Sequence, residues 1–167
     1  ERLRKLLAAG RLDLITSDVF DTLVTRPTAT PSDLFIGLAD RVDLPGHVTP
    51  QVFAAARRAA EQRARQDWSK QRRRELVEAS PDITEAELIV DPQVAAPEVT
   101  LAEIWERMPD SWGDRTVMLE VELTLEAEVL QPIPEAVEAF RWAKEAGVPV
   151  VLVSDIYLTS PQLTAVL

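Results

Sequence analysis

The 167-residue sequence contains no cysteine and a single histidine, His47. The absence of cysteine excludes disulfides, thiolate metal sites and cysteine nucleophiles. One histidine is too few for a metal site built from several histidines, and His47 has no partner in the sequence that would suggest a Ser-His-Asp triad. We assign His47 no role. The chemistry left to this chain is therefore that of carboxylates.

Long apolar runs are also missing. No stretch of about 18 uncharged apolar residues occurs, so the sequence predicts no membrane-spanning helix. The run that follows Glu1 is too short and too interrupted for a secretory signal, and we expect a cytoplasmic location. Acidic residues outnumber basic ones 28 to 18, which gives a net charge of −10. Because so negative a surface repels phosphate backbones, we expect neither nucleic acid nor membrane as a partner.

Two short apolar runs, 12–17 and 148–153, predict strands near the two ends of the sequence. Runs of this kind are typical of parallel strands buried on both faces. The sequence between them has helical periodicity, interrupted by a loop-rich stretch around Pro81, Pro92 and Pro97. Helices are predicted at 32–39, 50–66, 101–108, 115–130 and 134–146, with another beginning near 159–161.

Polar residues follow both predicted strands. Asp18 comes directly after the first apolar run and Ser154 directly after the second. The carboxyl ends of parallel strands are where open α/β sheets bind their ligands. A carboxylate there can act as a nucleophile toward a phosphoryl group, and a hydroxyl can donate to a phosphate oxygen. The same residues also suit a structural role, since Asp18, Thr22 and Ser154 can satisfy backbone donors in turns.

The segments around these two residues resemble motifs I and II of the haloacid dehalogenase superfamily. Residues 17–23 read S-D-V-F-D-T-L, and residues 154–158 read S-D-I-Y-L. They are similar to the "FDVFDTL" and "SDMYL" segments of a predicted-hydrolase group whose members are often fused to, or encoded beside, glycosyltransferases. The long interval between the two segments resembles that of members with a helical cap inserted after motif I.

The resemblance implies an α/β fold: a Rossmann-like core, incomplete in this sequence, with an inserted mobile helical cap. Residues 1–26 would form the first part of the core, 27–131 the cap, and 132–167 the second part of the core. Asp18 would be the nucleophile, and the hydroxyl of Ser154 would orient the transferring group. Mg²⁺ would be bound by the Asp18 carboxylate and the backbone carbonyl of Phe20.

Three further residues near these segments are candidates for binding a small anionic substrate. They are Thr22, Asp155 and Arg26. Arg26 follows motif I closely enough to direct its guanidinium at an anion, and it equally suits a solvated hinge.

The sequence departs from the superfamily pattern at two points. Phosphatase members usually carry a second Asp, the general acid, two residues after the nucleophile, whereas this chain has Phe20 there. Its extra carboxylate, Asp21, stands one residue later, where a structural role is favoured over acid catalysis. The superfamily also uses a lysine and further acids on later strands, and the sequence up to Leu167 has no match for them. We therefore expect these 167 residues alone to hydrolyse no phosphate ester.

Three functions remain open at this point. The leading one is a Mg²⁺-dependent hydrolase with an aspartyl nucleophile, acting on a small phosphate ester such as a sugar phosphate. A metal-independent dehalogenase-like hydrolase is favoured by Phe20. A non-catalytic accessory or ligand-binding domain attached to a glycosyltransferase is favoured by the missing later motifs.

Two further expectations concern surfaces. A core of two strands would leave sheet edges and apolar faces uncovered, so we expect additional chain, a dimer partner or a disordered remainder. The arginine-rich segment 57–74 contains interspersed acids and is interpreted as a solvated helix face rather than a nucleic-acid site.

Overall fold

The computed structural model describes residues 1–80, 82 and 99–167, so the predicted loop around Pro81, Pro92 and Pro97 lies outside the described residues. The chain divides into two compact units. Unit 1 contains residues 1–29 and 127–156, and unit 2 contains residues 30–126 and 157–167. Residues 157–167, which the sequence analysis places with the core, pack with unit 2.

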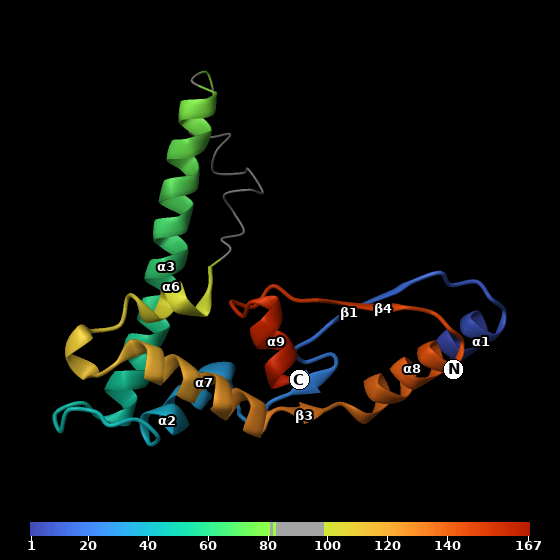
Figure 1. Cartoon of the computed structure of the whole chain (residues 1–167), viewed down its shortest axis with the longest axis horizontal. Coiled ribbons are helices and arrows are strands. Elements are labelled where there is room, and N and C mark those ends of the chain that lie inside the picture. The colour runs from blue at the N-terminus through green and yellow to red at the C-terminus, as the bar shows by residue number, and fades with distance from the viewer. Residues whose placement is uncertain (81, 83–98) are drawn as a thin grey trace. The chain divides into compact units, whose positions relative to one another are not determined.

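Unit 1 is built on a parallel pair of strands, β1 (Ile15–Asp18) and β4 (Val150–Val153) (Figure 1). Helix α8 (Pro134–Glu145) precedes β4, as predicted; Pro134 occupies its first turn, and Gly147 lies just beyond its end. Gly147 has φ 69°, a left-handed conformation that glycine adopts without the steric cost other residues incur. Helix α1 (Arg2–Ala8) packs on α8, where the Arg4 guanidinium lies 5.0 Å from the Trp142 ring centroid.

A second, antiparallel pair of strands joins β2 (Val24–Thr25) to β3 (Gln131–Pro132). It extends by one backbone bond, from the amide of Ile133 to the carbonyl of Leu23, at 2.8 Å. Neither this pair nor α1 was predicted. The pair escapes prediction because strands of two residues have no detectable periodicity. The pair connects the segment that follows β1 to the start of α8.

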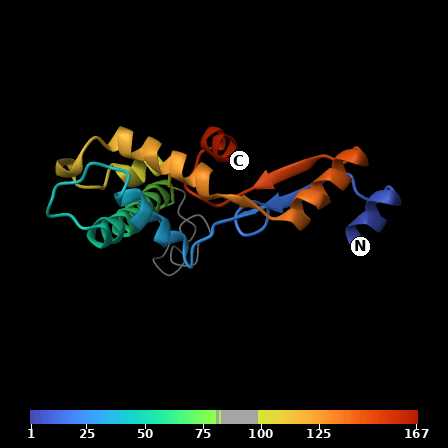
Figure 2. The same ribbon diagram turned by 90° about the horizontal axis from the view of Figure 1, so that it is seen from below.

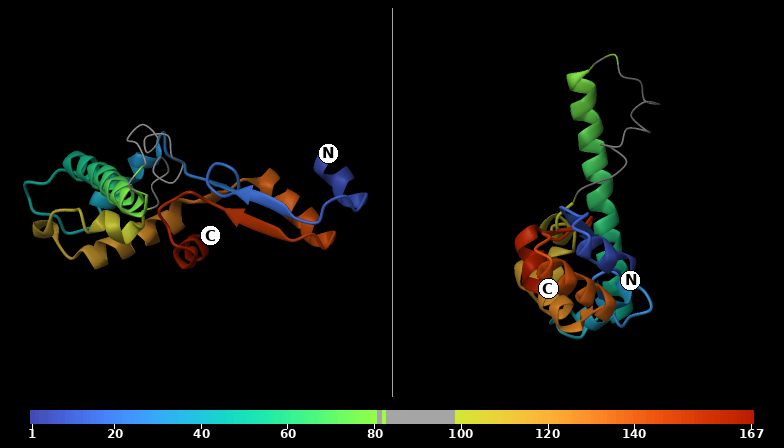
Figure 3. Two further views of the ribbon diagram at one scale, coloured as in Figure 1. Left: turned by 90° about the horizontal axis from the view of Figure 1, so that it is seen from above. Right: turned by 90° about the vertical axis from the view of Figure 1, so that its right-hand side faces the viewer.

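The parallel pairing of the two apolar runs is confirmed, but their predicted burial on both faces is wrong for this chain. Val151, Leu152 and Val153 are 46%, 38% and 57% exposed. Figures 2 and 3 show β1 and β4 running side by side in the same direction. Within the described residues the pair has no further strand beside it, and apolar side chains remain in solvent, as expected for so small a sheet.

Unit 2 is helical. Its core consists of large apolar side chains from several helices, among them Leu38, Phe53, Leu101, Ile104 and Trp105, each at most 1% exposed. The elements are η1 (Pro31–Asp33), α2 (Leu34–Ala39), α3 (Pro50–Ala79), α6 (Leu101–Trp105), η2 (Asp110–Trp112), α7 (Arg115–Val129) and α9 (Ser160–Val166).

The helix starts follow capping chemistry. Thr49 accepts a hydrogen bond from the Val52 amide at the start of α3, and Thr100 and Glu103 form a capping box on α6. Gln162 accepts from both the amide and the hydroxyl of Thr159 before α9, which confirms the predicted helix there. The helix predicted from residue 32 begins two residues later: Ser32 lies within η1, α2 begins at Leu34, and the turn before it is closed by Asp33, which accepts from the amide of Thr30.

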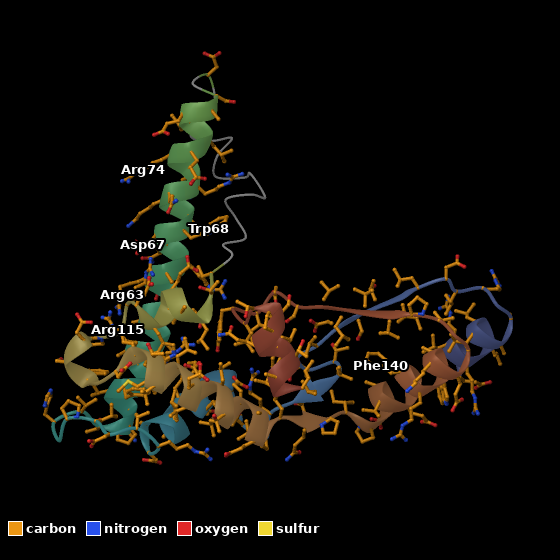
Figure 4. The ribbon with its side chains drawn as sticks, in the orientation of Figure 1. Arg63, Asp67, Trp68, Arg74, Arg115 and Phe140 are labelled. Carbon is orange, nitrogen blue, oxygen red and sulfur yellow. The ribbon has the colours of Figure 1, made fainter. Side chains whose placement is uncertain are left out.

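Helix α3 is longer than predicted, because it continues past Gln66 to Ala79. All its buried residues lie in its first half, on one face: Phe53, Ala54, Arg57, Ala60 and Ala64. Charged residues cover the remaining turns, and Figure 4 shows Arg63, Asp67 and Arg74 along this helix. Local ion pairs such as Arg65–Glu61 and Arg72–Glu75 agree with a solvated charged face for this part of the segment.

The structure as a whole is mixed α/β and mostly helical. Among the described residues the strands form one parallel and one antiparallel pair, and no Rossmann sheet is present. No helix in the described part of the chain is both long and apolar enough to cross a bilayer.

Candidate functional site

The predicted nucleophile and the predicted orienting hydroxyl lie at the same edge of the parallel pair. Asp18 is the last residue of β1 and is in register with Val153, the last residue of β4. Ser154 follows Val153 directly, so the chain places it at the carboxyl end of β4 beside the carboxyl end of β1. The sequence prediction that both strands end in a polar residue at one edge is confirmed. Asp18 itself belongs to the strand rather than to the loop after it.

A tight turn follows Asp18 and returns the chain to it. The amides of Leu23 and Val24 both donate to the Val19 carbonyl, at 2.8 and 3.1 Å, and the Asp21 amide donates to the Val24 carbonyl at 2.7 Å. Val19 is fully buried beneath the turn. Through this turn the hydroxyl of Thr22 reaches an Asp18 carboxylate oxygen, Oδ2, at 3.2 Å. Thr22 therefore contacts the predicted nucleophile directly.

Asp21 adopts φ 57°, and among the described non-glycine residues it alone has a positive φ. This left-handed conformation is one that Asp and Asn tolerate better than most residues. The Asp21 carboxylate accepts a hydrogen bond from the hydroxyl of Thr25 at 3.2 Å, two residues after the turn closes on Leu23. Both observations support the structural interpretation of Asp21 over its use as the missing general acid.

Phe20, at the position where phosphatases of the resembled superfamily carry the acid, pairs with Arg26. The Arg26 guanidinium carbon lies 4.4 Å from the centroid of the Phe20 ring. Such a stack attracts the cation to the face of the ring. It brings one candidate substrate-binding cation to the residue two positions after Asp18.

Oxygen donors near Asp18 suit a hard cation. Asp18 is exposed, and the turn's backbone hydrogen bonds use the carbonyls of Val19 and Val24 rather than that of Phe20. Mg²⁺ is commonly bound by one or two carboxylates plus waters and substrate phosphates, so the Asp18 carboxylate and the Phe20 carbonyl fit part of such a set. No cluster of three or more His, Asp or Glu residues with metal-binding geometry occurs within residues 1–80, 82 and 99–167.

On the second strand, the Ser154 hydroxyl accepts a long hydrogen bond, 3.5 Å, from the amide of Ile156. That bond is also what a serine closing a turn would make, so it agrees with either role for Ser154. Asp155 is exposed, and Ser154 is partly buried.

Sequence analysis missed a buried ionic cluster in unit 2. Arg57 and Glu122 are both fully buried and form a bidentate pair, Nε to Oε2 at 3.0 Å and Nη2 to Oε1 at 2.7 Å. The indole of Trp105 donates to the same Oε2 at 2.8 Å. The interpretation of Arg57 as part of a solvated face is therefore wrong. Glu126, on the same helix as Glu122, is buried as well.

One signal for this cluster was available in the sequence. Arg57 lies on the same helical face as Phe53, Ala60 and Ala64, at spacings of three and four residues. A lone arginine on an otherwise apolar face indicates a buried cation with an acidic partner. The partner itself, 65 residues away on α7, could not be identified from local pattern.

The comparisons with known proteins add nothing to these observations. No protein-family model matches the chain, and no curated protein matches it. The case for the site rests on its motifs and its geometry.

Proposed function

We propose that this protein is a hydrolase of the haloacid dehalogenase type that uses Asp18 as a nucleophile on a small phosphate ester, such as a sugar phosphate. One observation carries the proposal. Asp18 and Ser154 occupy the carboxyl ends of two adjacent parallel strands, and the turn after β1 brings the Thr22 hydroxyl to the Asp18 carboxylate. A nucleophile, a hydroxyl donor and a supporting turn at one sheet edge suit phosphoryl transfer.

The chemistry proceeds in two displacements. A carboxylate oxygen of Asp18 attacks phosphorus, the ester P–O bond breaks, and an aspartyl phosphate forms. The leaving oxygen takes its proton from solvent, because Phe20 stands where the superfamily acid would be. Water then attacks the same phosphorus, the bond to Asp18 breaks, inorganic phosphate departs, and the carboxylate is restored. Ser154 and Arg26 would bind the phosphoryl oxygens in both steps.

The Asp18 carboxylate and the Phe20 carbonyl would bind Mg²⁺. When bound, the ion supplies charge neutralisation between the carboxylate and the phosphate dianion. Residues 1–26 and 132–167 would be parts of a Rossmann-like core, and residues 27–131 would form the inserted cap. A glycosyltransferase, fused or encoded nearby, and a cytoplasmic location would follow from the same resemblance.

The pair of Phe20 and Arg26 favours a second candidate. In a metal-independent, dehalogenase-like hydrolase the leaving group needs no proton. An aromatic residue such as Phe20, stacked on Arg26, can therefore replace the general acid without loss of activity. The aspartyl nucleophile and the sheet edge would be the same, and the electrophile would be carbon instead of phosphorus.

The test uses the protein at its natural length, whatever that length is. Phosphate release from a set of phosphate monoesters is measured with and without Mg²⁺, for the wild type and for Asp18→Asn. The proposal expects release that requires Mg²⁺ and Asp18. Halide release from 2-haloacids, dependent on Asp18 and independent of Mg²⁺, would support the second candidate. No turnover of either kind would favour an accessory domain.

A further inference from the structure

Basic and acidic residues of helix α3 alternate along the sequence but lie on separate sides of the helix. At about 100° per residue, five exposed basic side chains fall within about 160° of its circumference. These residues, which form the basic face, are Arg58, Arg63, Lys70, Arg73 and Arg74. The acids of α3 fall within about 120° on the other side. They are Glu61, Asp67, Glu75 and Glu78. The basic face therefore contains no negative charge of its own.

Acids beside the basic face are bound by other cations. Asp67, at the border of the face, accepts a hydrogen bond from Nε of Arg107 at 3.1 Å. On the other side of the helix, Glu75 pairs with Arg72 at 3.1 Å. Within the face, Arg63 donates to the backbone carbonyl of Arg107 at 3.0 Å, and this neutral acceptor leaves the positive charge of Arg63 uncompensated.

Like charges are neighbours on the basic face. Arg73 and Arg74 follow Lys70 at three and four positions, spacings at which like charges destabilise a helix. None of these three side chains forms an ion pair with a residue that the structure describes. No residue of α3 after Ala64 is buried, so packing of this part of the helix does not offset the repulsion. Negative charge brought by a partner would relieve it.

The neighbours of these cations favour a protein partner over a nucleic acid. Val52 and Val77, 49% and 44% exposed, lie on the same side of α3 and flank the basic residues. Exposed apolar side chains at both ends suit the apolar residues of a partner helix. The aromatic residues of α3 lie off this face: Phe53 is buried, and Figure 4 shows Trp68 on the opposite side of the helix from Arg74. The face thus offers no ring on which a nucleic-acid base could stack.

We propose that the basic face of α3 is a docking site for an acidic helical segment of another protein. Carboxylates of the partner would pair with the exposed guanidinium groups, whose geometry suits carboxylate oxygens, and its apolar residues would cover Val52 and Val77. In a chain of net charge −10, long-range attraction for an acidic partner is confined to this face. The docking site does not depend on the proposed hydrolase activity.

An acidic peptide tests the docking site on the protein at its natural length. The probe is a fluorescein-labelled helical peptide of about 25 residues, the length that spans Val52 to Val77. It carries glutamates along one side and a leucine near each end. A second peptide, with glutamine in place of every glutamate, is its control. Fluorescence anisotropy measures binding at low salt and at about 0.5 M salt.

Two variants with equal changes in net charge separate the basic face from the overall charge. The face variant removes three exposed cations from α3: Arg58→Gln, Lys70→Gln and Arg73→Gln. The control variant removes three exposed cations from unit 1: Arg11→Gln, Arg141→Gln and Lys144→Gln. Because all six side chains are exposed, both variants should fold, which circular dichroism checks.

We expect the glutamate peptide to bind the wild type about tenfold or more tightly than the glutamine peptide does. The face variant should lose about tenfold or more in affinity, and the control variant about twofold or less. About 0.5 M salt should weaken binding to the wild type by about tenfold, because the pairs lie in solvent. Equal affinity for the two peptides, or equal losses in the two variants, would overturn the proposal.

The same proteins distinguish other occupants of the basic face. An oligothymidylate that binds more tightly than the glutamate peptide, and that the face variant fails to bind, would replace the proposed partner by a nucleic acid. Self-association of the wild type that is sensitive to salt and absent in the face variant would assign the face to a second copy of this chain. Sedimentation of both proteins at low and high salt measures this, and either result would overturn the proposal.

Discussion

Asp18 and Val153 are register partners at the carboxyl ends of β1 and β4, which makes Ser154 the next residue at the edge where the Asp18 carboxylate lies. The turn from Val19 to Val24 then directs the Thr22 hydroxyl to that carboxylate. Two segments more than a hundred residues apart in sequence are thus joined by four register positions of a parallel ladder. The proposed function depends on this juxtaposition more than on any other feature.

Replacing the nucleophile should abolish activity without harming the fold. Asp18 is exposed, and the hydrogen bond shown for its side chain comes from Thr22. Asp18→Asn keeps an acceptor for that hydroxyl, so we expect a change in the free energy of unfolding within about 0.5 kcal/mol. Turnover should fall by about 10⁴-fold or more, as when other covalent nucleophiles are removed. Thermal unfolding and phosphate release measure the two effects, and retained turnover would exclude Asp18 as nucleophile.

Substitution of Asp21 tests whether this residue is the general acid that protonates the leaving group. Asp21→Asn keeps a residue that tolerates φ 57° and an oxygen for the Thr25 hydroxyl, but it carries no acidic proton. We expect turnover and stability close to the wild type. Asp21→Ala loses the tolerance of a positive φ and the oxygen that accepts from Thr25, and it should destabilise the protein by about 1–2 kcal/mol. A large loss of turnover in Asp21→Asn, with normal stability, would show that Asp21 is the acid after all.

The absence of an acid at Phe20 predicts a dependence on the leaving group. Without a positioned proton donor, esters with acidic alcohols should be hydrolysed far faster than alkyl esters. We expect kcat/KM to rise steeply from alkyl phosphates to aryl phosphates such as p-nitrophenyl phosphate. A rate that is independent of leaving-group pKa would indicate a general acid that the sequence and the structure do not identify.

The buried pair Arg57–Glu122 should behave as a coupled unit. Arg57→Met alone leaves a buried carboxylate without its cation and should cost about 3–5 kcal/mol of unfolding free energy. Glu122→Gln keeps an oxygen for the Trp105 indole, so the double variant Arg57→Met/Glu122→Gln should lose clearly less than the sum of the two single variants. Denaturant unfolding of all four proteins measures the coupling. Strict additivity would contradict the pairing.

Tyr157, the one tyrosine of the chain, should report its surroundings by its own ionisation. Burial raises the pKa of Tyr157 above its usual range, and the nearby carboxylate of Glu122 raises it further. The positive charge of Arg57 lowers this pKa, but by less. The carboxylates of Glu126 and Glu61 add smaller increases. Because the folded pKa exceeds the unfolded value, this residue's contribution to stability is complete below about pH 10 and is lost as the pH rises above it.

The near-ultraviolet absorbance of tyrosinate measures that ionisation for Tyr157 alone. We expect it to develop in the folded protein only above the pH at which free tyrosine ionises, and Tyr157→Phe to flatten the fall in stability at high pH. Tyrosinate forming near about pH 10 in protein that is still folded would contradict the burial of this ring.

Local patterns predicted much of the fold. The apolar runs 12–17 and 148–153 indicated the parallel strands, and helix-end signals such as Pro134 and Gly147 placed α8 closely. Burial was harder to predict, because it depends on what lies above a strand or a helix face. Val151 and Val153 are exposed because, among the described residues, β1 and β4 form a sheet of only two strands. Glu122 is buried because a distant arginine compensates its charge.

In the candidate site, too, local pattern predicted some residues, whereas others depend on the path of the folded chain. Asp18, Ser154 and Thr22 were identifiable from residue type and from the ends of the apolar runs. The stack of Arg26 on Phe20 and the left-handed turn at Asp21 depend on the path of the chain between β1 and β2, which hydrophobic periodicity does not encode. In unit 2, the contact of the Arg57 guanidinium with the Tyr157 ring joins residues a hundred positions apart in the chain, and contacts at such separation leave no local signal.

Detection of a phosphoryl group on Asp18 tests the central claim most directly. The protein at its natural length is incubated with Mg²⁺ and acetyl phosphate, a donor whose leaving group needs no protonation, then quenched in acid and digested for mass spectrometry. The account predicts a phosphoryl adduct on the peptide that contains Asp18, absent in Asp18→Asn and present in Asp21→Asn. Phosphate release that continues in Asp18→Asn, or proceeds in the wild type with no adduct at Asp18, would contradict it.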